Sequence, residues 1–330
     1  MITQKLYEFT FTGPYADLCT QFISHKRALG FKYYESGQWL RMFDNYCKTV
    51  HRTVPSVPDK SLINGFLDTL SYLAPKSKSN ILTTLRQFGL FLSELNHEAY
   101  IPSMQKLKGN EFTPYIYSKS EVKRLLASIN DMKVNLRSPY MHAVLPTIIR
   151  MLYGCGLRIS EAVALLKSDV NLDEGVLLIR ESKFEKDRLL PMSESLLLVC
   201  RHYLEDHRIM AAESPYFFPA PDGGFLSTSA IRERFRTMLA KTGIGQGRRN
   251  RPRLHDLRHT FAVHCLRQWV KDGVDIMAAL PVLATYLGHD DIKSTGRYLR
   301  LTADVFPEIA ALMSKTCTGL FPEVSDVAAH

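Results

Sequence analysis

The sequence predicts a mainly α-helical protein of two domains, the second of which carries one small β-hairpin. Its 330 residues exceed the roughly 250–300 at which single cores stop growing, which favours two domains. Apolar residues recur three and four positions apart along most of the chain, the spacing of one buried helix face. Two short apolar runs around a polar turn interrupt this pattern, and they predict strands at Val176–Arg180 and Arg188–Pro191.

The first 108 residues predict a domain of four amphipathic helices. The expected helices run from near Pro14 to Gly30, from Ser36 to Val50, from Pro58-Asp59 to Leu73, and from Ile81 to Leu95. Their apolar stripes are typical of a packed core and not of a cofactor site.

A linker is expected at residues 109–117, because the helical period lapses in a stretch that contains Pro102, Gly109 and Pro114. The second domain, residues 118–330, opens on a capping box, in which Ser118 and Glu121 satisfy free backbone amides at the start of a helix. Apart from the hairpin, this domain is expected to be mostly helical.

The net charge of +9, from 42 Lys and Arg against 33 Asp and Glu, favours an anionic partner. Nucleic acid is the leading expectation, ahead of an anionic membrane surface. No stretch approaches the ~18 uninterrupted apolar residues of a membrane span, and the first residues hold no apolar run of signal-peptide length. We therefore expect a cytoplasmic, nucleoid-associated protein with no membrane partner. The six cysteines lack zinc-ligand spacing, which favours reduced, buried side chains.

Two segments carry cations of the kind that phosphate chemistry requires. In YGCGLRISEA, Arg158 follows two glycines and begins a helix, where its guanidinium can hold two phosphate oxygens. The polar turn of the hairpin, ESKFEKDR, carries Lys183. Taken alone, an arginine at a helix start or a lysine in a turn is more often a solvated surface residue.

Two further segments add histidines and a phenol. In RPRLHDLRH, His255 and Arg258 are three residues apart and therefore share one helix face, whereas His259 is expected to pack or hydrogen-bond behind the site. In YLGHDDIKSTGRY, His289 precedes Tyr298 by nine residues. A phenol with an ordinary pKa near ~10 needs cations or a base close by to act as a nucleophile, and the other segments supply them.

Tyr298, and not its neighbour Tyr286, is the expected nucleophile. Tyr286 lies in the apolar run VLATYL and is expected to pack inward. Tyr298 lies between Arg297 and Arg300, in a segment that we expect to be too polar for complete burial. The sequence thus predicts an exposed Tyr298 and a buried Tyr286.

Basic residues indicate where a DNA backbone could lie. Residues 232–258 hold nine Lys and Arg against Glu233 and Asp256. A solvated face explains the basic residues of the first domain nearly as well as DNA contact does. The candidate DNA-binding residues are Lys76, Lys78, Arg86, Arg248, Arg249, Arg251 and Arg253.

Taken in order, these residues resemble the tyrosine recombinase, or phage integrase, family. That family carries Arg, Lys, His-x-x-Arg, His or Trp, and Tyr, and here the set is Arg158, Lys183, His255, Arg258, His289 and Tyr298. The resemblance implies the tyrosine recombinase fold, with a SAM-like core-binding, DNA-binding domain at residues 1–108 and a catalytic domain at 118–330. One departure is that Ser182 and Phe184, and not glycines, flank Lys183.

The resemblance also implies a mechanism that uses no metal and no cofactor. Tyr298 attacks the scissile phosphate and forms a 3′-phosphotyrosine, while Arg158 and Arg258 clamp its non-bridging oxygens. Lys183 protonates the leaving 5′-oxygen, His255 assists proton removal from Tyr298, and His289 hydrogen-bonds the phosphate. Glu161 and Asp256 are candidates for orienting the arginine and the histidine, or are simple helix-start carboxylates.

The expected function is site-specific recombination of double-stranded DNA sites. The segment LPVLATYLGH is similar to integrases of mobile elements, which favours integration, excision or transposition. Alternatives are a Xer-like chromosome resolvase, a type IB topoisomerase and a catalytically idle DNA-binding protein. The family resemblance implies a monomer when free, a homotetramer on synapsed DNA and, in some systems, an accessory recombinase. An apolar stripe in the C-terminal segment predicts a buried surface; its members are Val305, Phe306, Ile309, Leu312 and Met313. The resemblance implies that this stripe docks on a neighbouring protomer, and docking in cis is the alternative.

Overall fold

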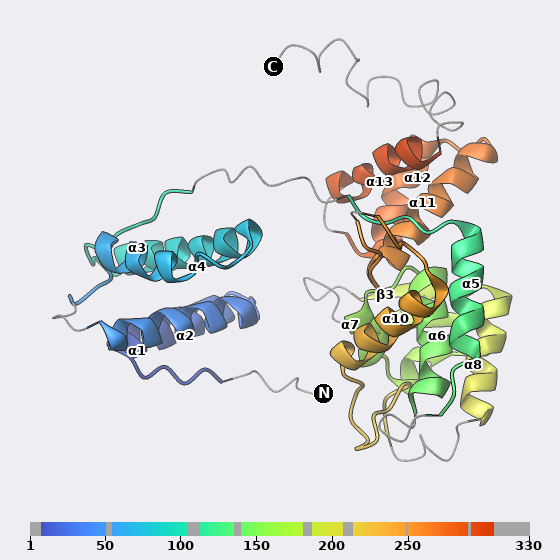
Figure 1. Ribbon diagram of the computed structural model, residues 1–330, viewed down its shortest axis with the longest axis horizontal. Coiled ribbons are helices and arrows are strands. Elements are labelled where there is room, and N and C mark those ends of the chain that lie inside the picture. Colours follow the sequence, from blue (N-terminus) through green and yellow to red (C-terminus); the bar gives the residue numbers. More distant parts are fainter. Residues whose placement is uncertain are drawn as a thin grey trace, which may run out of the picture. The chain divides into compact units, whose positions relative to one another are not determined.

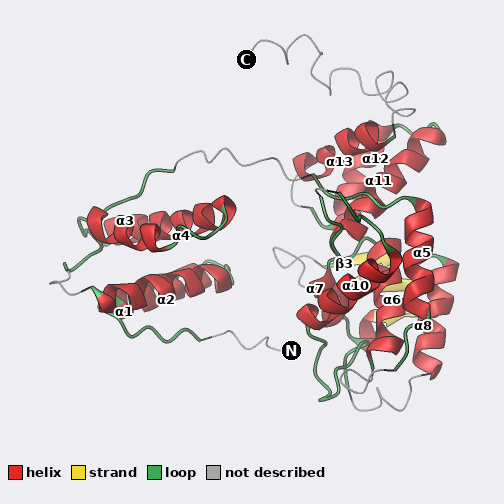
Figure 2. Cartoon of the chain, viewed as in Figure 1, coloured by secondary structure: helices red, strands yellow, loops and turns green. Residues whose placement is uncertain are grey.

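The chain forms two compact units, Met1–Phe112 and Thr113–His330 (Figure 1). In the computed structural model, the described residues are 8–50, 55–104, 113–134, 140–180, 187–206, 214–248, 250–289 and 292–306. Helices dominate both units, and the second unit also holds a small sheet (Figure 2). The expected mainly α-helical fold is therefore confirmed.

The first unit holds the four expected helices. They are α1 (Ala16–Ala28), α2 (Tyr34–Thr49), α3 (Lys60–Thr69) and α4 (Pro75–Glu94). Asp59 caps α3, since its side chain accepts a hydrogen bond of 2.7 Å from the Leu62 amide. Their apolar faces form one core, which is rich in aromatic rings such as Phe22, Phe43 and Phe88.

The second unit begins with the expected capping box, in which Ser118 and Glu121 satisfy each other's backbone amides. Its α-helices are α5 (Lys119–Asn130), α6 (Met141–Gly154), α7 (Ile159–Ala164), α8 (Glu194–Asp206), α10 (Thr228–Thr242), α11 (Asp256–Lys271), α12 (Ile276–Leu287) and α13 (Ile292–Val305). A short 3₁₀ helix, η1, spans Lys167–Asp169.

Three short antiparallel strands make up the sheet, in the order β1-β2-β3. They are β1 (Val170–Asn171), β2 (Val176–Ile179) and β3 (Arg188–Pro191), and the register pairs Ile179 with Arg188. The two predicted strands are present, and β1 adds a third that is too short for a periodic signal. The tip of the hairpin, with Lys183, lies outside the described residues.

Helices α11, α12 and α13 pack together around a small apolar cluster that includes Leu266, Leu283 and Tyr298. Figure 1 draws these three helices side by side in orange and red, at one end of the second unit. This cluster includes the tyrosine of the predicted site. Within the described part of the chain, no helix is long and apolar enough to cross a membrane.

Candidate active site

The turn between α6 and α7 sets the position of the first candidate arginine. Gly156 has φ +60°, and a Cβ there would lie 2.6 Å from the Phe261 ring, so a side chain has neither the conformation nor the space. Arg158 follows as the N-cap residue of α7. The glycine thus brings the backbone close to α11 and leaves Arg158 at the helix start.

Arg258, in the first turn of α11, is almost completely buried, with 2% of its surface exposed. It donates a hydrogen bond of 2.6 Å to the Gly156 carbonyl and another to the Leu287 carbonyl. Burial and the neighbouring charge of Arg158 lower the pKa of Arg258 to about 10. Backbone carbonyls therefore hold the Arg258 guanidinium in place, and neither of these two hydrogen bonds is to a carboxylate.

Glu161 holds the second arginine. Its Oε1 accepts a hydrogen bond of 2.7 Å from Arg158 Nη1, and its Oε2 accepts one of 2.8 Å from the Arg158 backbone N–H. Glu161 thus binds the guanidinium and also caps α7, and its role in orienting Arg158 for catalysis stays a prediction. Burial opposes its charge, but hydrogen bonds and charge from Arg188 hold the pKa of Glu161 below its ordinary value.

A third arginine, Arg188, contacts the same carboxylate and was not singled out from the sequence. Arg188 Nη1 and Nη2 donate to Glu161 Oε1 and Oε2 at 3.1 and 2.9 Å, and both side chains are only 8% exposed. The sequence held one signal for this contact. Strand parity places Arg188 on the same face as the buried Leu190, two residues further along β3.

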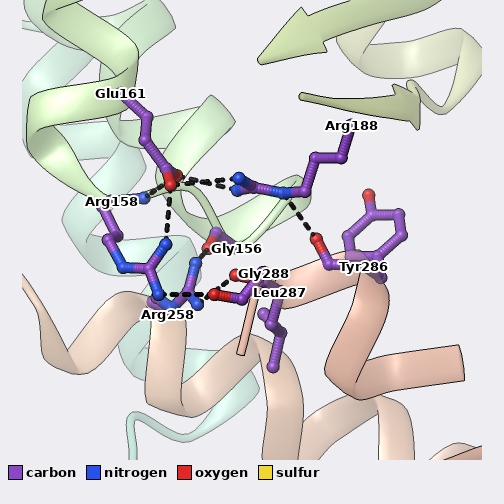
Figure 3. A network of polar contacts seen from close by, with 8 residues as sticks. All are labelled: Gly156, Arg158, Glu161, Arg188, Arg258, Tyr286, Leu287 and Gly288. Atoms are coloured by element: carbon purple, nitrogen blue, oxygen red, sulfur yellow. Dashed lines mark hydrogen bonds and ion pairs between the residues drawn. The ribbon is translucent and has the colours of Figure 1, made fainter. Parts of the chain in front are cut away.

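The C-terminal end of α12 binds all three arginines. The carbonyls of Tyr286, Leu287 and Gly288 each accept a hydrogen bond from a different guanidinium, in order from Arg188 (3.0 Å), Arg258 and Arg158 (2.8 Å) (Figure 3). A helix C-terminus leaves its last carbonyls without helical partners and carries partial negative charge. It is therefore suited to gather cations.

Tyr298 lies on α13 and is buried, with 3% of its surface exposed. Its phenolic oxygen is 3.0 Å from His259 Nδ1, and its ring stacks on His289 with centroids 6.0 Å apart. Burial raises the pKa of Tyr298, although the charges of Arg258, Arg158 and Arg297 oppose that rise. The phenol is thus protonated at neutral pH and sits within reach of a histidine.

The expectation that Tyr298 is exposed was wrong. Its polar neighbours Arg297 and Arg300 are exposed, whereas Tyr298 and Leu299 face the apolar cluster between α11 and α12. Tyr286, expected in the core, is only half buried, and its ring stacks on Phe261. A helix of mixed polarity still has one buried face, so polar neighbours in sequence do not imply exposure.

Residues 116–304 match the phage integrase family. The chain belongs to this family. An integrase/recombinase of Sinorhizobium fredii, y4rB, is 31% identical over 87% of this chain and 93% of its own length. The tyrosine recombinase XerD of Shewanella oneidensis is 29% identical over 78% of this chain and 82% of its own length. The protein is accordingly a site-specific recombinase, an enzyme that breaks and rejoins DNA.

Solved structures of recombinases share the fold. The XerH recombinase bound to palindromic difH substrate has a TM-score of 0.62 at 19% identity, over 84% of this chain and 78% of that one. The Tn1549 transposon integrase bound to circular intermediate DNA has a TM-score of 0.62 at 15% identity, over 85% and 94%. At such low identities, the likeness concerns the fold.

Three histidines of the recombinase lie around Tyr298: His259 and His289 contact its ring, and His255 lies against His259. The His255 and His259 rings meet edge to face at 4.8 Å, and His289 Nδ1 lies 2.9 Å from Thr295 Oγ1. Removal from water and nearby arginines lower the pKa of His255 to about 4, although part of this residue is exposed. Burial, His255 and Arg258 lower the pKa of His259 to about 3. Both imidazoles are therefore neutral at physiological pH.

Asp256 supports the turn that leads into α11. Its Oδ2 accepts a hydrogen bond of 2.8 Å from the Arg253 backbone N–H. This bond fixes the segment from which His255 projects, so the carboxylate acts on the backbone next to the histidine. Burial raises the pKa of Asp256 to about 6.

The candidate DNA-binding residues have diverse surroundings in the recombinase. Lys76 is exposed and Lys78 half buried, while Arg86 donates to the Pro102 carbonyl at 2.8 Å. Arg248 lies over the Tyr115 ring at 5.5 Å. Arg251 and Arg253 are exposed, and Arg249 lies outside the described residues. Among the side chains that are described, no three His, Cys, Asp or Glu residues gather as metal ligands would.

Proposed function

We propose that this recombinase cuts and rejoins DNA recombination sites through a 3′-phosphotyrosine at Tyr298, for integration, excision or transposition of a mobile element. The observation that carries the proposal is the meeting of three guanidiniums at the end of α12, with a phenol held among histidines beside them. The candidate DNA partner is the double-stranded recombination site.

The charge of the arginine cluster suits an anion. Arg158 and Arg188 bind the carboxylate of Glu161, whereas Arg258 binds the backbone carbonyls of Gly156 and Leu287. Among the described contacts of this cluster, positive charge is therefore in excess. Burial, and after it the charge of Arg158, lower the pKa of Arg258, so the protonated guanidinium is held at a cost in free energy. A phosphodiester would relieve the cost, and the same cations would stabilise the charge that grows as the phosphate is attacked.

The proposed chemical step forms one bond and breaks one. The Tyr298 oxygen attacks phosphorus, the bond from phosphorus to the 5′-oxygen breaks, and the DNA 3′-phosphate remains on the phenol. The leaving 5′-oxygen takes a proton from Lys183, and His289 donates a hydrogen bond to the phosphate. The reverse attack by the 5′-hydroxyl of a partner strand rejoins the DNA without an external energy source.

The proton of the phenol has a different nearest acceptor from the one first expected. His255 was assigned this role, but its ring lies against His259, and His259 Nδ1 is the atom 3.0 Å from the Tyr298 oxygen. We therefore assign the first acceptor position to His259 and leave His255 to act behind it or on the phosphate. Geometry within hydrogen-bond reach is the first requirement of a general base.

The mobile-element role rests on the LPVLATYLGH segment and on the full-length relation to the y4rB integrase/recombinase. Chromosome-dimer resolution is the second candidate, because the relatives also include XerD of Shewanella oneidensis. The position of the cleaved site discriminates between them. A site at the end of a transferable element supports the first role, and a single chromosomal site supports the second.

The proposed assembly follows the family. Residues 1–108 would form the DNA-binding core-binding domain, with residues 109–117 as linker and the catalytic domain after it. The free protein would be a monomer and the synapsed complex a homotetramer, with an accessory recombinase where the element encodes one. Basic side chains such as Lys76, Arg248 and Arg251 would follow the DNA backbone.

A nicked duplex that carries the inverted repeat of an element end tests the proposal. The nick lets the cleaved fragment diffuse away, so the wild type is expected to leave a covalent adduct on a denaturing gel, also in EDTA. Recombinant junctions are expected from two intact sites. Relaxation of supercoiled circles without junctions would instead indicate a topoisomerase, and tight binding without an adduct would indicate an idle DNA-binding protein.

A further inference from the structure

We propose that Arg188 is a positioning residue of the recombinase, which sets Arg158 through Glu161 and ties β3 to the end of α12. The inference rests on the proposed function, since it concerns how Arg158 meets the scissile phosphate. Arg188 is not one of the six residues of the predicted catalytic set.

All three guanidinium nitrogens of Arg188 are used inside the protein. Nη1 and Nη2 bind the two oxygens of Glu161 at 3.1 and 2.9 Å, and Nε binds the Tyr286 carbonyl at 3.0 Å. Figure 3 shows Glu161 between the guanidiniums of Arg188 and Arg158. Three of its five N–H donors are thus used inside the protein, and its side chain is only 8% exposed, so Arg188 is suited to hold other groups more than to bind DNA itself.

The effect on Arg158 passes through shared oxygens. Glu161 Oε1 accepts from both Arg188 Nη1 and Arg158 Nη1, and Oε2 accepts from both Arg188 Nη2 and the Arg158 backbone N–H. The two parallel bonds from Arg188 therefore set the plane of the carboxylate. Arg158 binds the same two oxygens in the directions that Arg188 leaves free. A bidentate pair fixes orientation in a way that a single point charge cannot.

The Glu161 carboxylate needs a cation besides Arg158 to stay ionised. Glu161 is 8% exposed, and Arg158, at 25% exposure, is the partner that would turn toward DNA. A buried carboxylate left with one mobile partner would be costly, so Arg188 keeps Glu161 ionised while Arg158 engages the phosphate. Lysine would retain the charge at position 188 but lose the fork and the bond to Tyr286.

The arrangement also joins parts of the site that are far apart in sequence. Arg188 begins β3, Glu161 lies on α7, and Tyr286 belongs to α12, whose next two carbonyls bind Arg258 and Arg158. Arg188 follows Lys183 by five residues in the chain. A shift of β3 would therefore move Arg158 and Arg258. A misplacement of about 1 Å in a catalytic group can lower the rate roughly 100-fold.

The test compares Arg188→Lys and Arg188→Gln on two nicked duplexes that differ at the scissile phosphate. One carries the ordinary phosphodiester, and the other a methylphosphonate, in which a methyl group replaces one charged oxygen. A neutral phosphorus group depends less on an arginine clamp. Strand cleavage is scored whether the product remains as adduct or is released by water, and Arg158→Lys supplies the reference pattern.

Arg180→Lys and Arg180→Gln are the matched controls. Arg180 stands directly after β2 and binds a buried carboxylate, that of Asp169, at 2.7 Å, so it has the same chemistry in the same hairpin. The controls are expected to cleave both substrates within about 3-fold of the wild type. Half-site binding and the unfolding temperature of each variant show that it is folded.

The positioning role predicts that Arg188→Lys slows cleavage of the ordinary phosphate by roughly 10–100-fold and cleavage of the methylphosphonate by less than about 3-fold, as Arg158→Lys does. Equal losses on the two substrates would mean that Arg188 only supports the fold, and unchanged cleavage would mean that it does not matter; either result overturns the inference. If the wild type cleaves neither duplex, the proposed function fails, and the inference falls with it.

Discussion

The phenolic oxygen of Tyr298 lies 3.0 Å from Nδ1 of His259, inside the apolar cluster of α11, α12 and α13. Burial raises the pKa of the tyrosine, and burial with nearby positive charge lowers the pKa of the histidine to about 3. At neutral pH the pair is therefore a protonated phenol beside an uncharged imidazole. This is the protonation state in which the imidazole can accept the proton of the nucleophile.

His259→Phe is expected to slow adduct formation by roughly 100-fold, because it removes the acceptor and keeps a ring of similar shape. His259→Asn, which offers a short polar side chain, is expected to lose less. The measurement is the single-turnover rate of adduct formation on a nicked site. His264→Phe is the matched control, because His264 lies on α11 as His259 does, and its Nδ1 also lies 3.0 Å from a phenolic oxygen, that of Tyr153 on α6. A loss in the control as large as that of His259→Phe would refute the assignment.

Tyr298→Phe is expected to abolish the covalent adduct while half-site binding stays within a few-fold. The substitution removes only the hydroxyl, and the buried ring keeps its packing against α11 and His289. Tyr286→Phe is the control, because that hydroxyl bonds the Pro191 carbonyl at 3.4 Å and the Cys155 side chain, and neither residue belongs to the predicted catalytic set. Capture of Tyr298→Phe by a nicked substrate, with the nucleotide mapped to another residue, would show that the nucleophile lies elsewhere.

Local patterns predicted the helices well, because caps and apolar spacing act over a few residues. The capping box at Ser118 and the strand at Arg188–Pro191 stand where they were expected. Burial of Tyr298 was missed because it depends on which face of α13 meets α11, and that is decided by tertiary packing.

Arg188 was missed for a related reason. Its partners Glu161 and Tyr286 lie 27 and 98 residues away in the chain, and no local pattern reports such contacts. The histidine assignment has the same origin: spacing placed His255 and Arg258 on one helix face, but spacing alone does not tell which histidine the phenol meets.

Stability is expected to fall as the pH is lowered from 7 to 5. The pKa values of His255, His259 and His264 are lowered to about 4, 3 and 4, against an ordinary value near 6.5. As the pH falls below ~6.5, these histidines become protonated in the unfolded chain while they stay neutral in the folded one. Their contribution to the free energy of unfolding is therefore fully present above this pH and is lost as the pH falls. Asp256, with its pKa raised to about 6, acts in the opposite direction.

Two variants separate these contributions in thermal unfolding at pH 7 and pH 5. His259→Asn is expected to reduce the pH-dependent loss by about 1 kcal/mol, a value discounted for partial solvent screening. Asp256→Asn is expected to increase the loss, because it removes the group that favours the folded state as the pH falls. If both variants lost as much stability between pH 7 and pH 5 as the wild type, the shifted pKa values of His259 and Asp256 would be contradicted.

Gly288→Ala is expected to destabilise the protein and to slow cleavage. Gly288 has φ +64°, which costs an alanine about 1 kcal/mol, and its Cβ would lie 3.0 Å from Arg188 Nη1. Gly273→Ala is the matched control, since Gly273 has φ +72° and nothing within 4 Å of a Cβ. Both variants should lose similar stability from backbone strain, but only Gly288→Ala should lose cleavage rate. If Gly273→Ala also cleaved slowly, the loss of cleavage rate in Gly288→Ala would be due to backbone strain and not to the contact with Arg188.

The C-terminal segment is expected to act in synapsis, and the structure shows where to truncate the chain. Phe306, a member of the predicted apolar stripe, packs in cis, with the Arg267 guanidinium 3.9 Å from its ring centroid. A deletion from Ala303 would therefore damage the packing of α13, whereas a chain that ends at Phe306 keeps it. Of the other stripe positions, Val305 ends α13, and Ile309, Leu312 and Met313 lie outside the described residues.

The truncated protein 1–306 is expected to bind a half-site within a few-fold of the full chain and to form the adduct on a nicked half-site. Pairing of two sites on a native gel, and recombinant product, should fall by roughly 10-fold or more, because the apolar stripe would dock on a neighbouring protomer. The variant Ile309→Asp/Leu312→Asp in the full chain should behave in the same way without a change in length. If the stripe docks in cis instead, truncation will lower the unfolding temperature of the free monomer and leave pairing intact. Undiminished recombination by both variants would refute docking between protomers.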